Sequence, residues 1–295
     1  MFRYRAFGLS FDSELELKSP IADGPGPADV TIRAGSVEPV RHRRFPDRRA
    51  HRVDVDEARF RLTVPRAFSL SVLDGHEIVF DRLRGGDDQI ESSLWVDAIA
   101  AVLLQRGQLG LHASMVRMPR GAVAVAGAVG AGKTTMLAAL LERGATMMAD
   151  DVSVVSTDSD GAALGHPGLP VMQVNADIRS EFGLAQVDRA EVHSRSAVRV
   201  SHFETAPLSV SEVYMIGPSG DGAINAKWLD GVAAFSALAR GSYGLEYIEG
   251  LGVRAEHTRA VAEVAAVVDV CELRVPHGMD CVRRVAEAIE NDAFR

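Results

Sequence analysis

A glycine-rich segment near the middle of the chain constrains the fold more than any other feature of the sequence. Residues 127–134 read Gly-Ala-Val-Gly-Ala-Gly-Lys-Thr and satisfy the pattern G-x-x-x-x-G-K-[ST] at every position. The apolar run Ala122–Ala126 precedes this segment, and apolar residues recur at helical spacing over 136–141. A buried strand, a tight glycine loop and a helix in this order are typical of a phosphate-binding loop in an α/β fold.

The residues of this loop have the properties that a phosphate site requires. Glycines allow the backbone to turn successive N–H groups toward phosphate oxygens, and the helix N-terminus adds a partial positive charge. Lys133 is expected to reach the β- and γ-phosphates of a nucleoside triphosphate, and the Thr134 hydroxyl to bind Mg²⁺. The alternative is a glycine-rich turn without a ligand. The predicted nucleotide-binding residues are Gly127, Ala128, Val129, Gly130, Ala131, Gly132, Lys133, Thr134 and Thr135.

Lysine is rare in this chain, which makes the lysine of the loop informative. Of the 32 Lys and Arg residues, only Lys18, Lys133 and Lys227 are lysines. Arg, Ala, Gly and Val are all abundant, as GC-rich codons would give. Yet the chain keeps lysine inside the loop, where a compact ammonium fits and a planar guanidinium does not.

Two adjacent carboxylates interrupt an apolar run downstream of the loop. Asp150 and Asp151 divide Met147–Val155, a run typical of a strand buried on both faces, where an unpaired Asp is costly. We therefore expect both acids at a strand end beside the phosphates. Asp151 would join Thr134 at the metal, and Asp150 would accept the proton of the attacking hydroxyl. The reverse assignment of the two acids stays open, as does the simpler interpretation that both begin a loop.

One histidine lies on the predicted strand that precedes the loop strand. His112 belongs to the run Leu109–Val116, and alone it would be interpreted as a core residue. If the two strands are neighbours, its imidazole can lie near the γ-phosphate or orient a base. The predicted catalytic residues are therefore Asp150, His112 and Lys133.

The chain divides into a β-rich first part, residues 1–86, and an α/β second part, residues 87–295. In the first part apolar and polar residues alternate, as in Phe60–Val64, and Asp74-Gly75 between two apolar runs is typical of a β-hairpin. The second part opens with a predicted helix from Asp87 to about Gly107. Further predicted strands are Leu109–Met118, Ala122–Ala126, Thr146–Val155, Val210–Ile216 and Glu272–Val275, and further helices are Lys133–Arg143, Leu229–Arg240, Arg259–Val268 and Cys281–Asn291.

The composition excludes several classes of protein. The chain has 295 residues, of which 47% are hydrophobic and 24% charged, as in an ordinary globular protein. A formal net charge of −8 argues against a nucleic-acid partner, and no apolar window is long enough to span a membrane. The N-terminus lacks the apolar core of a signal peptide, and Cys271 and Cys281 are too few for a disulfide framework or a zinc cage. We therefore expect a reduced cytoplasmic protein.

A basic cluster stands out from this acidic background. Arg41, Arg43, Arg44, Arg48 and Arg49 fall within nine residues. Two interpretations are open, a solvated loop or edge strand and a docking surface for an acidic partner.

Three motifs in order carry a family resemblance. The segments GLHASMVRM, VAVAGAVGAGKTT and RGATMMADDVSVV resemble the kinase domain of the HPr kinase/phosphorylase family over about residues 105–175. The resemblance implies an α/β P-loop kinase fold akin to phosphoenolpyruvate carboxykinase, with ATP and Mg²⁺ as cofactors, a serine hydroxyl as acceptor and a homo-oligomeric assembly. By matching position, it assigns His112, Lys133, Thr134, Asp150 and Asp151 to the active site.

Other segments depart from that family and resemble a subfamily. Thr135 stands where HPr kinases have Glu, and His166–Val174 stands where their second glycine-rich signature is expected. The opening FRYRAFGLSFDSELEL and the HPGLP segment resemble instead the HPr-kinase-related proteins encoded with lasso peptide maturation enzymes. In that subfamily the acceptor is the C-terminal serine of a precursor peptide.

The leading hypothesis is an ATP- and Mg²⁺-dependent serine kinase that acts on a peptide, with the β-rich first part as one wall of the peptide groove. One alternative is a kinase for another protein or for a small hydroxylated molecule. The other is a non-catalytic regulator or scaffold that binds ATP to stabilise a complex.

Overall fold

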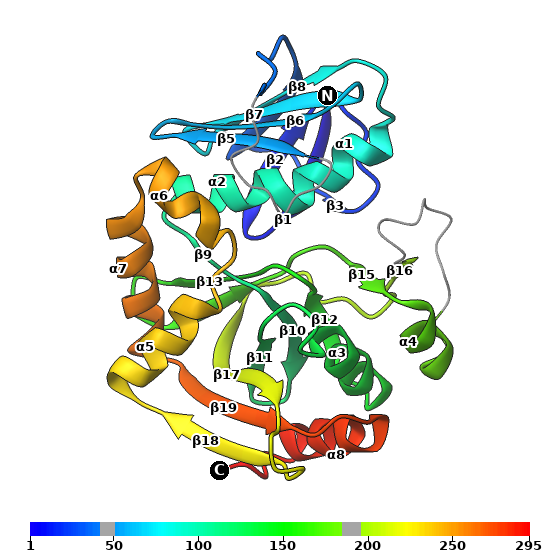
Figure 1. Ribbon diagram of the computed structural model, residues 1–295, viewed down its shortest axis with the longest axis vertical. Coiled ribbons are helices and arrows are strands. Elements are labelled where there is room, and N and C mark those ends of the chain that lie inside the picture. Colours follow the sequence, from blue (N-terminus) through cyan, green and yellow to red (C-terminus); the bar gives the residue numbers. More distant parts are fainter. Residues whose placement is uncertain (42–50, 185–195) are drawn as a thin grey trace. The chain divides into compact units, whose positions relative to one another are not determined.

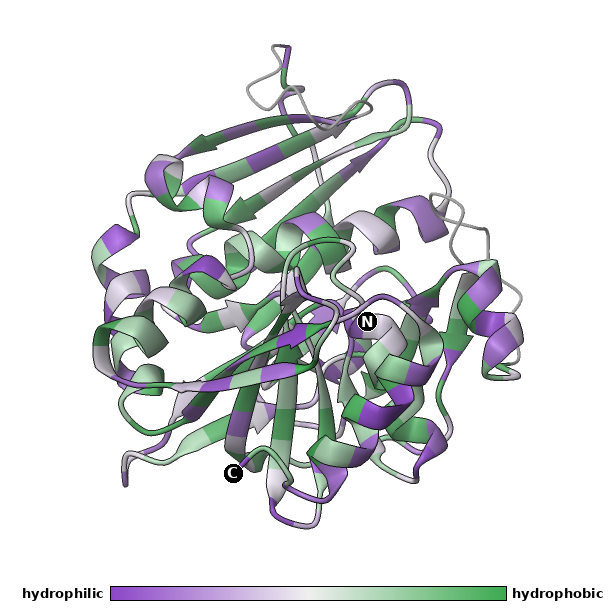
Figure 2. Cartoon of the chain, turned by 60° about the horizontal axis from the view of Figure 1, so that its bottom comes forward, coloured by the Kyte–Doolittle hydropathy of each residue, from purple (hydrophilic) through white to green (hydrophobic). Residues whose placement is uncertain are grey.

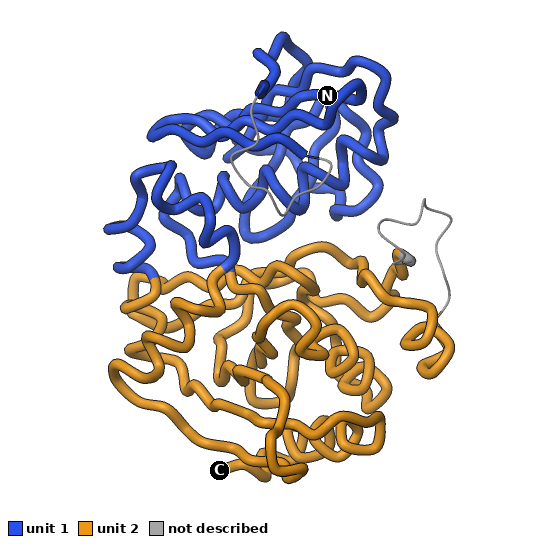
Figure 3. The backbone as a smooth tube through the Cα atoms, in the orientation of Figure 1, with its two compact units in different colours: residues 1–110, 243–260 blue, residues 111–242, 261–295 orange. Residues whose placement is uncertain are grey.

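The computed structural model describes residues 1–41, 51–184 and 196–295. The chain folds into two compact units (Figure 3), unit 1 with Met1–Gly110 and Tyr243–Ala260, and unit 2 with Leu111–Ser242 and Val261–Arg295. The sequence prediction had a single boundary after residue 86, whereas unit 1 also takes in the helical segment that follows and a later return of the chain. Four of the five clustered arginines, Arg43, Arg44, Arg48 and Arg49, lie outside the described residues.

Unit 1 is built on an eight-stranded sheet with the strand order β3-β1-β2-β4-β8-β7-β6-β5 (Figure 1). The predicted hairpin is confirmed, because β7 and β8 pair antiparallel around Asp74 and Gly75, whose φ angles are 49° and 68°. Positive φ at both positions matches the twist of the flanking strands. The strands are β1 (Phe2–Ala6), β2 (Leu9–Ser13), β3 (Ile21–Ala22), β4 (Val30–Ala34), β5 (Arg52–Asp56), β6 (Arg59–Val64), β7 (Phe68–Leu73) and β8 (Glu77–Arg82).

A long helical segment belongs to unit 1 because its apolar side packs on this sheet. It consists of α1 (Asp87–Ser93), the π-helical turn η1 (Leu94–Ala98) and α2 (Ile99–Gln105). Trp95 meets Phe11 of β2 edge to face, with ring centroids 5.4 Å apart. Later in the chain follow η2 (Leu245–Tyr247), α6 (Ile248–Leu251) and α7 (Arg254–Ala265).

The sheet of unit 2 places the glycine loop at the end of a central strand. Its strand order is β12-β10-β11-β17-β14-β13, and β19 pairs with β17 and with β18. Strands β11, β17 and β19 run parallel, and β12 shares their direction because both β12 and β11 pair antiparallel with β10. The carboxyl ends of these four strands therefore meet at one edge. The strands are β10 (Ala113–Met118), β11 (Gly121–Ala126), β12 (Thr146–Ala149), β13 (Ser153–Thr157), β14 (Ala163–His166), β17 (Leu208–Pro218), β18 (Asn225–Leu229) and β19 (Asp269–Val275).

Two helices, α3 (Lys133–Glu142) and α8 (Met279–Glu290), cover one face of this sheet, and the strands beneath them are hydrophobic (Figure 2). The buried core there includes Leu137, Tyr214, Leu273, Val285 and Ile289. The remaining elements of unit 2 are α5 (Gly231–Arg240), the two-stranded sheet of β15 (Val171–Val174) and β16 (Ser196–Arg199), and α4 (Ala176–Glu181). No helix within the described ranges is both long and apolar enough to cross a membrane.

Several predicted elements have different bounds in the structure. The predicted strand Leu109–Met118 is two strands, β9 (Leu109–Leu111) and β10, and the predicted strand Thr146–Val155 is divided into β12 and β13. Both interruptions fall at polar residues, His112 and Asp150-Asp151. The predicted helix Leu229–Arg240 begins only at Gly231, because β18 occupies the preceding residues.

A carboxylate is buried in the middle of this sheet. Glu212 of β17 is 0% exposed and forms ion pairs with Arg120 at 2.9 Å and Arg295 at 3.2 Å. The hydroxyl of Tyr214 donates a hydrogen bond to Glu212 Oε2 at 3.0 Å. Burial acts to raise the pKa of Glu212, but the hydrogen bonds and charge of Arg120, with the bonds from Tyr214 and Arg295, lower it below its usual value.

Glu212→Ala is expected to lower the free energy of unfolding by about 3 kcal/mol, because it leaves Arg120 and Tyr214 facing a buried site without their acceptor. The ionised carboxylate contributes stability above the ordinary glutamate pKa of about 4.3, and this contribution is lost as the pH falls through the lowered pKa of the folded state. Urea unfolding at neutral and acidic pH measures both effects. Glu290→Ala is the control, since the half-exposed Glu290–Arg143 pair contributes about 0–1 kcal/mol. Equal losses in the two variants would contradict the prediction.

Candidate phosphate-binding site

The glycine loop joins β11 to α3 and is closely fitted to the neighbouring strand. A Cβ atom on Gly127 would lie 2.5 Å from the carbonyl oxygen of Ile216, so only glycine fits there. Gly132 directly precedes the helix as its N-cap and has a φ of 95°, a left-handed conformation that glycine adopts without strain. Ala128, Val129 and Gly130 are exposed at the tip of the loop. The loop thus has the form expected of a phosphate-binding turn.

Lys133 is the first residue of α3 and is 7% exposed. Its ammonium group donates hydrogen bonds to the carbonyl oxygens of Gly127 at 2.9 Å and Ala128 at 3.0 Å. The side chain therefore folds back along the loop, and its charge lies beside the carbonyl oxygens of the first two loop residues.

Asp150 follows β12 and lies against the start of α3. Its Oδ1 atom accepts hydrogen bonds from Ser114 Oγ at 2.7 Å and from Thr134 Oγ1 at 3.3 Å, and its Oδ2 atom accepts one from the Gln173 backbone N–H at 3.4 Å. Loss of hydration raises the pKa of Asp150, the bond from Ser114 opposes this shift, and the charge of Asp151 adds to it. The carboxyl group thus accepts hydrogen bonds from these three donors, one of which is the hydroxyl of the loop threonine.

An irregularity in the strand pairing sets the position of Asp150. Met115 of β10 faces Ala149, but the next residue, Val116, faces Met147, so that Met148 is an extra residue on β12. Such a bulge alters the direction in which the following side chains point, and bulges recur next to active sites. Continuing the pairing from Met115 and Ala149 puts Ser114 opposite Asp150, in agreement with their hydrogen bond.

Asp151 points to a different partner. Its φ of 68° is a left-handed conformation that Asp tolerates better than most residues, and it separates the directions of the two neighbouring acids. Asp151 Oδ1 lies 3.1 Å from His112 Nε2, and the two side chains are 43% and 24% exposed. The carbonyl oxygen of His112 accepts a hydrogen bond from Gly127 N–H at 3.4 Å. The histidine and Asp151 therefore lie at the base of the loop and remain accessible to solvent.

The segment that departs from the HPr kinase pattern borders these acids. The Gly168 N–H donates to the carbonyl oxygen of the bulged Met148 at 2.8 Å, and the Gln173 N–H reaches Asp150. Residues of the HPGLP segment thus help to fix the end of β12.

The structure brings all the predicted site residues to one edge of the sheet of unit 2, but the contacts pair them differently from the prediction. Thr134 was grouped with Asp151 and His112 with Asp150, whereas Thr134 contacts Asp150 and His112 contacts Asp151. Ser114 was missed. The available signal is a polar residue two positions after His112, on a strand face whose next two residues, Val116 and Met118, are apolar.

The donor groups at this edge suit Mg²⁺ held together with a nucleotide. Within the described part of the chain, no group of three or more His, Cys, Asp and Glu side chains is arranged to hold a metal. Mg²⁺ bound with substrate phosphates needs only one or two protein oxygens and keeps several waters. The Thr134 hydroxyl and the Asp150 carboxylate supply two such oxygens side by side.

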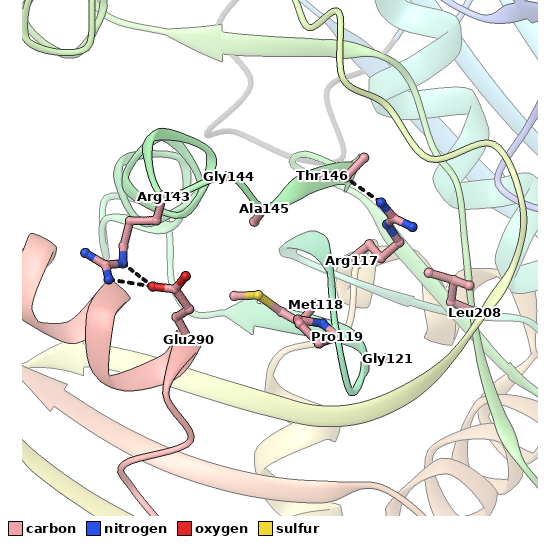
Figure 4. A pocket seen from close by; sticks show the side chains of 10 residues that line it. All are labelled: Arg117, Met118, Pro119, Gly121, Arg143, Gly144, Ala145, Thr146, Leu208 and Glu290. Carbon is pink, nitrogen blue, oxygen red and sulfur yellow. Dashed lines mark hydrogen bonds and ion pairs between the residues drawn. The ribbon is translucent and has the colours of Figure 1, made fainter.

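A cavity of about 510 Å³ lies elsewhere in unit 2 (Figure 4). It opens at the amino end of β11, whereas the glycine loop follows the carboxyl end of that strand. Arg143 and Glu290 form one wall, where Arg143 Nε donates a hydrogen bond to Glu290 Oε2 at 2.6 Å. At another wall, Arg117 Nη2 lies 3.5 Å from Thr146 Oγ1. The residues that line this cavity do not include any of the predicted site residues.

Comparisons with known proteins give similarities among solved structures but none among sequences. No protein-family model and no curated protein sequence matches the chain. Among solved structures, the chain is similar to the HPr(Ser) kinase/phosphatase from Coxiella burnetii, with 11% identity over 63% of this chain and 96% of that chain and a TM-score of 0.34. A TM-score of this size does not define a common fold.

Proposed function

We propose that this protein is an ATP- and Mg²⁺-dependent kinase that phosphorylates a serine hydroxyl of a peptide. The observation that carries the proposal is the presence of two acids with separate partners at the edge where the glycine loop begins. Asp150 contacts the loop threonine, and Asp151 contacts His112. Binding of a nucleotide alone requires the loop but not a second, exposed acid with a histidine beside it.

The contacts favour a division of labour between the acids that is the reverse of the one first predicted. Asp150 and Thr134 would hold Mg²⁺, which when bound neutralises charge on the β- and γ-phosphates. Lys133 and the loop N–H groups would bind the same phosphates. Asp151, oriented by His112, would accept the proton of the serine hydroxyl. The serine oxygen would form a bond to the γ-phosphorus as the bond between the γ-phosphorus and the β-phosphate oxygen breaks, which releases ADP.

The acceptor is proposed from the sequence resemblance. The opening segment and the HPGLP motif favour the C-terminal serine of a lasso peptide precursor, and the β-rich sheet of unit 1 is the proposed site for the rest of the peptide. An extended peptide commonly binds along strands, which provide backbone hydrogen bonds at regular spacing.

Incubation with ATP, Mg²⁺ and a peptide that ends in serine tests the proposal. We expect a product heavier by one phosphate, located at the terminal serine by tandem mass spectrometry, and no product from the same peptide ending in alanine. A protein that binds ATP tightly but phosphorylates no peptide, protein or small-molecule acceptor would instead be a nucleotide-dependent scaffold. Phosphate found on a different acceptor would keep the kinase and replace the substrate.

A further inference from the structure

We infer that Ser114 is a positioning residue, which holds the Asp150 carboxylate in the orientation needed to bind Mg²⁺ together with Thr134. The inference rests on the proposed function and adds to it a residue that the family resemblance does not assign to the active site. Ser114 lies on β10, the strand between β11 and β12, and its side chain is 2% exposed. Its hydroxyl donates to Asp150 Oδ1 at 2.7 Å, the shortest of the three hydrogen bonds to this carboxyl group.

The geometry of the shared oxygen gives Ser114 its role. Asp150 Oδ1 accepts bonds from both Ser114 and Thr134, so the serine fixes the carboxylate with one oxygen directed at the loop hydroxyl. The Gln173 N–H restrains the opposite oxygen at 3.4 Å. Without the serine bond, Oδ1 would be held only by the longer bond from Thr134 at 3.3 Å, and rotation about the Cβ–Cγ bond of Asp150 would be less restrained. The two oxygens that Mg²⁺ needs side by side would then be less well organised.

Ser114 lies in apolar surroundings, and Asp150 is the hydrogen-bond partner that allows a hydroxyl to be buried there. The neighbouring residues Ala113 and Met115 are buried and apolar, and a buried hydroxyl without a hydrogen-bond partner is destabilising. The bulge at Met148 brings Asp150 opposite this serine, so the serine and the acid each provide the other's partner. Outer partners of metal ligands change metal affinity by about 10–100-fold when they are replaced.

The test measures Mg²⁺-dependent binding rather than turnover. The affinity for a non-hydrolysable ATP analogue is measured by calorimetry in Mg²⁺ and in EDTA, for the wild type, Ser114→Ala and Ser114→Thr. We expect Ser114→Ala to reduce the Mg²⁺-dependent gain in affinity by about 10-fold or more and to leave the affinity in EDTA nearly unchanged. Ser114→Thr retains the hydroxyl and is expected to retain most of the gain.

Ser153→Ala is the matched control. Ser153 is equally buried, but its hydroxyl donates to the carbonyl oxygen of Ala113 at 2.8 Å and not to Asp150. Its loss should lower stability without changing the effect of Mg²⁺. If Ser114→Ala does not fold, Ser114→Cys places a somewhat larger but weakly donating thiol at this position and should show the same loss.

The inference is overturned if Ser114→Ala keeps the full Mg²⁺ gain, or if its affinity falls equally in EDTA, or if Ser153→Ala has the same effect. These outcomes are distinct from failure of the proposed function. A wild-type protein that binds the Mg²⁺–nucleotide complex but phosphorylates no acceptor contradicts the kinase assignment and leaves the binding test of Ser114 valid.

Discussion

Asp151→Asn is expected to reduce kcat for phosphate transfer by about 10²–10⁴-fold, while the affinity for the Mg²⁺–ATP complex stays within a few-fold of the wild type. Asn has the size of Asp but cannot accept the proton of the serine hydroxyl. Asp151 is 43% exposed, so an acceptor hydroxyl can approach it, and the nearby His112 Nε2 at 3.1 Å fixes its orientation. Steady-state kinetics and calorimetry measure the two quantities separately.

Asp150→Asn is the matched control for this prediction, because it makes the same chemical change one residue away. Since Asp150 contacts Thr134 and the proposed metal position, this variant should weaken binding of the Mg²⁺–nucleotide complex more than binding of the nucleotide in EDTA. Undiminished transfer by Asp151→Asn would contradict its role as base. If Asp150→Asn instead abolishes transfer and keeps Mg²⁺–ATP binding, the assignment first predicted from the sequence is the right one.

The parts of this site that the sequence predicted are those encoded locally. The glycine loop is bounded by an apolar strand and a largely apolar helix, so its place between β11 and α3 follows from a short window of sequence. The same holds for the hairpin at Asp74-Gly75, where turn chemistry and flanking strands are adjacent in the chain. Local pattern also placed the acids at a strand end, since a strand buried on both faces excludes unpaired carboxylates.

The pairing of the acids could not be predicted, because it depends on backbone irregularities that arise in tertiary structure. The extra residue Met148 in β12 and the left-handed conformation of Asp151 decide which acid meets Thr134 and which meets His112. No residue type marks either feature in advance. Long-range returns of the chain were missed for a similar reason, since the assignment of Tyr243–Ala260 to unit 1 depends on packing far from it in sequence.

Lysine at position 133 should not be replaceable by arginine, even though the chain otherwise prefers arginine. The Lys133 ammonium is 7% exposed and sits within 3.0 Å of two loop carbonyl oxygens. A guanidinium is larger and planar, and it would displace the loop that we propose binds the phosphates. We expect Lys133→Arg to lower kcat/KM for ATP by about 10²–10³-fold, as much as Lys133→Ala does, because Lys133→Ala removes the charge and Lys133→Arg moves it away from the proposed position of the transferred phosphate.

Lys227→Arg is the control that separates this effect from a general cost of exchanging lysine for arginine. Lys227 lies on β18 with its side chain exposed, and such a change is expected to alter stability by less than about 0.5 kcal/mol and activity little. Kinetics and thermal unfolding of both variants test the contrast. If Lys133→Arg turned over ATP like the wild type, charge alone would suffice at this position, and the rarity of lysine would then reflect codon usage throughout the chain. If only Lys133→Arg fails while both variants stay folded, a compact ammonium is required by the shape of the loop.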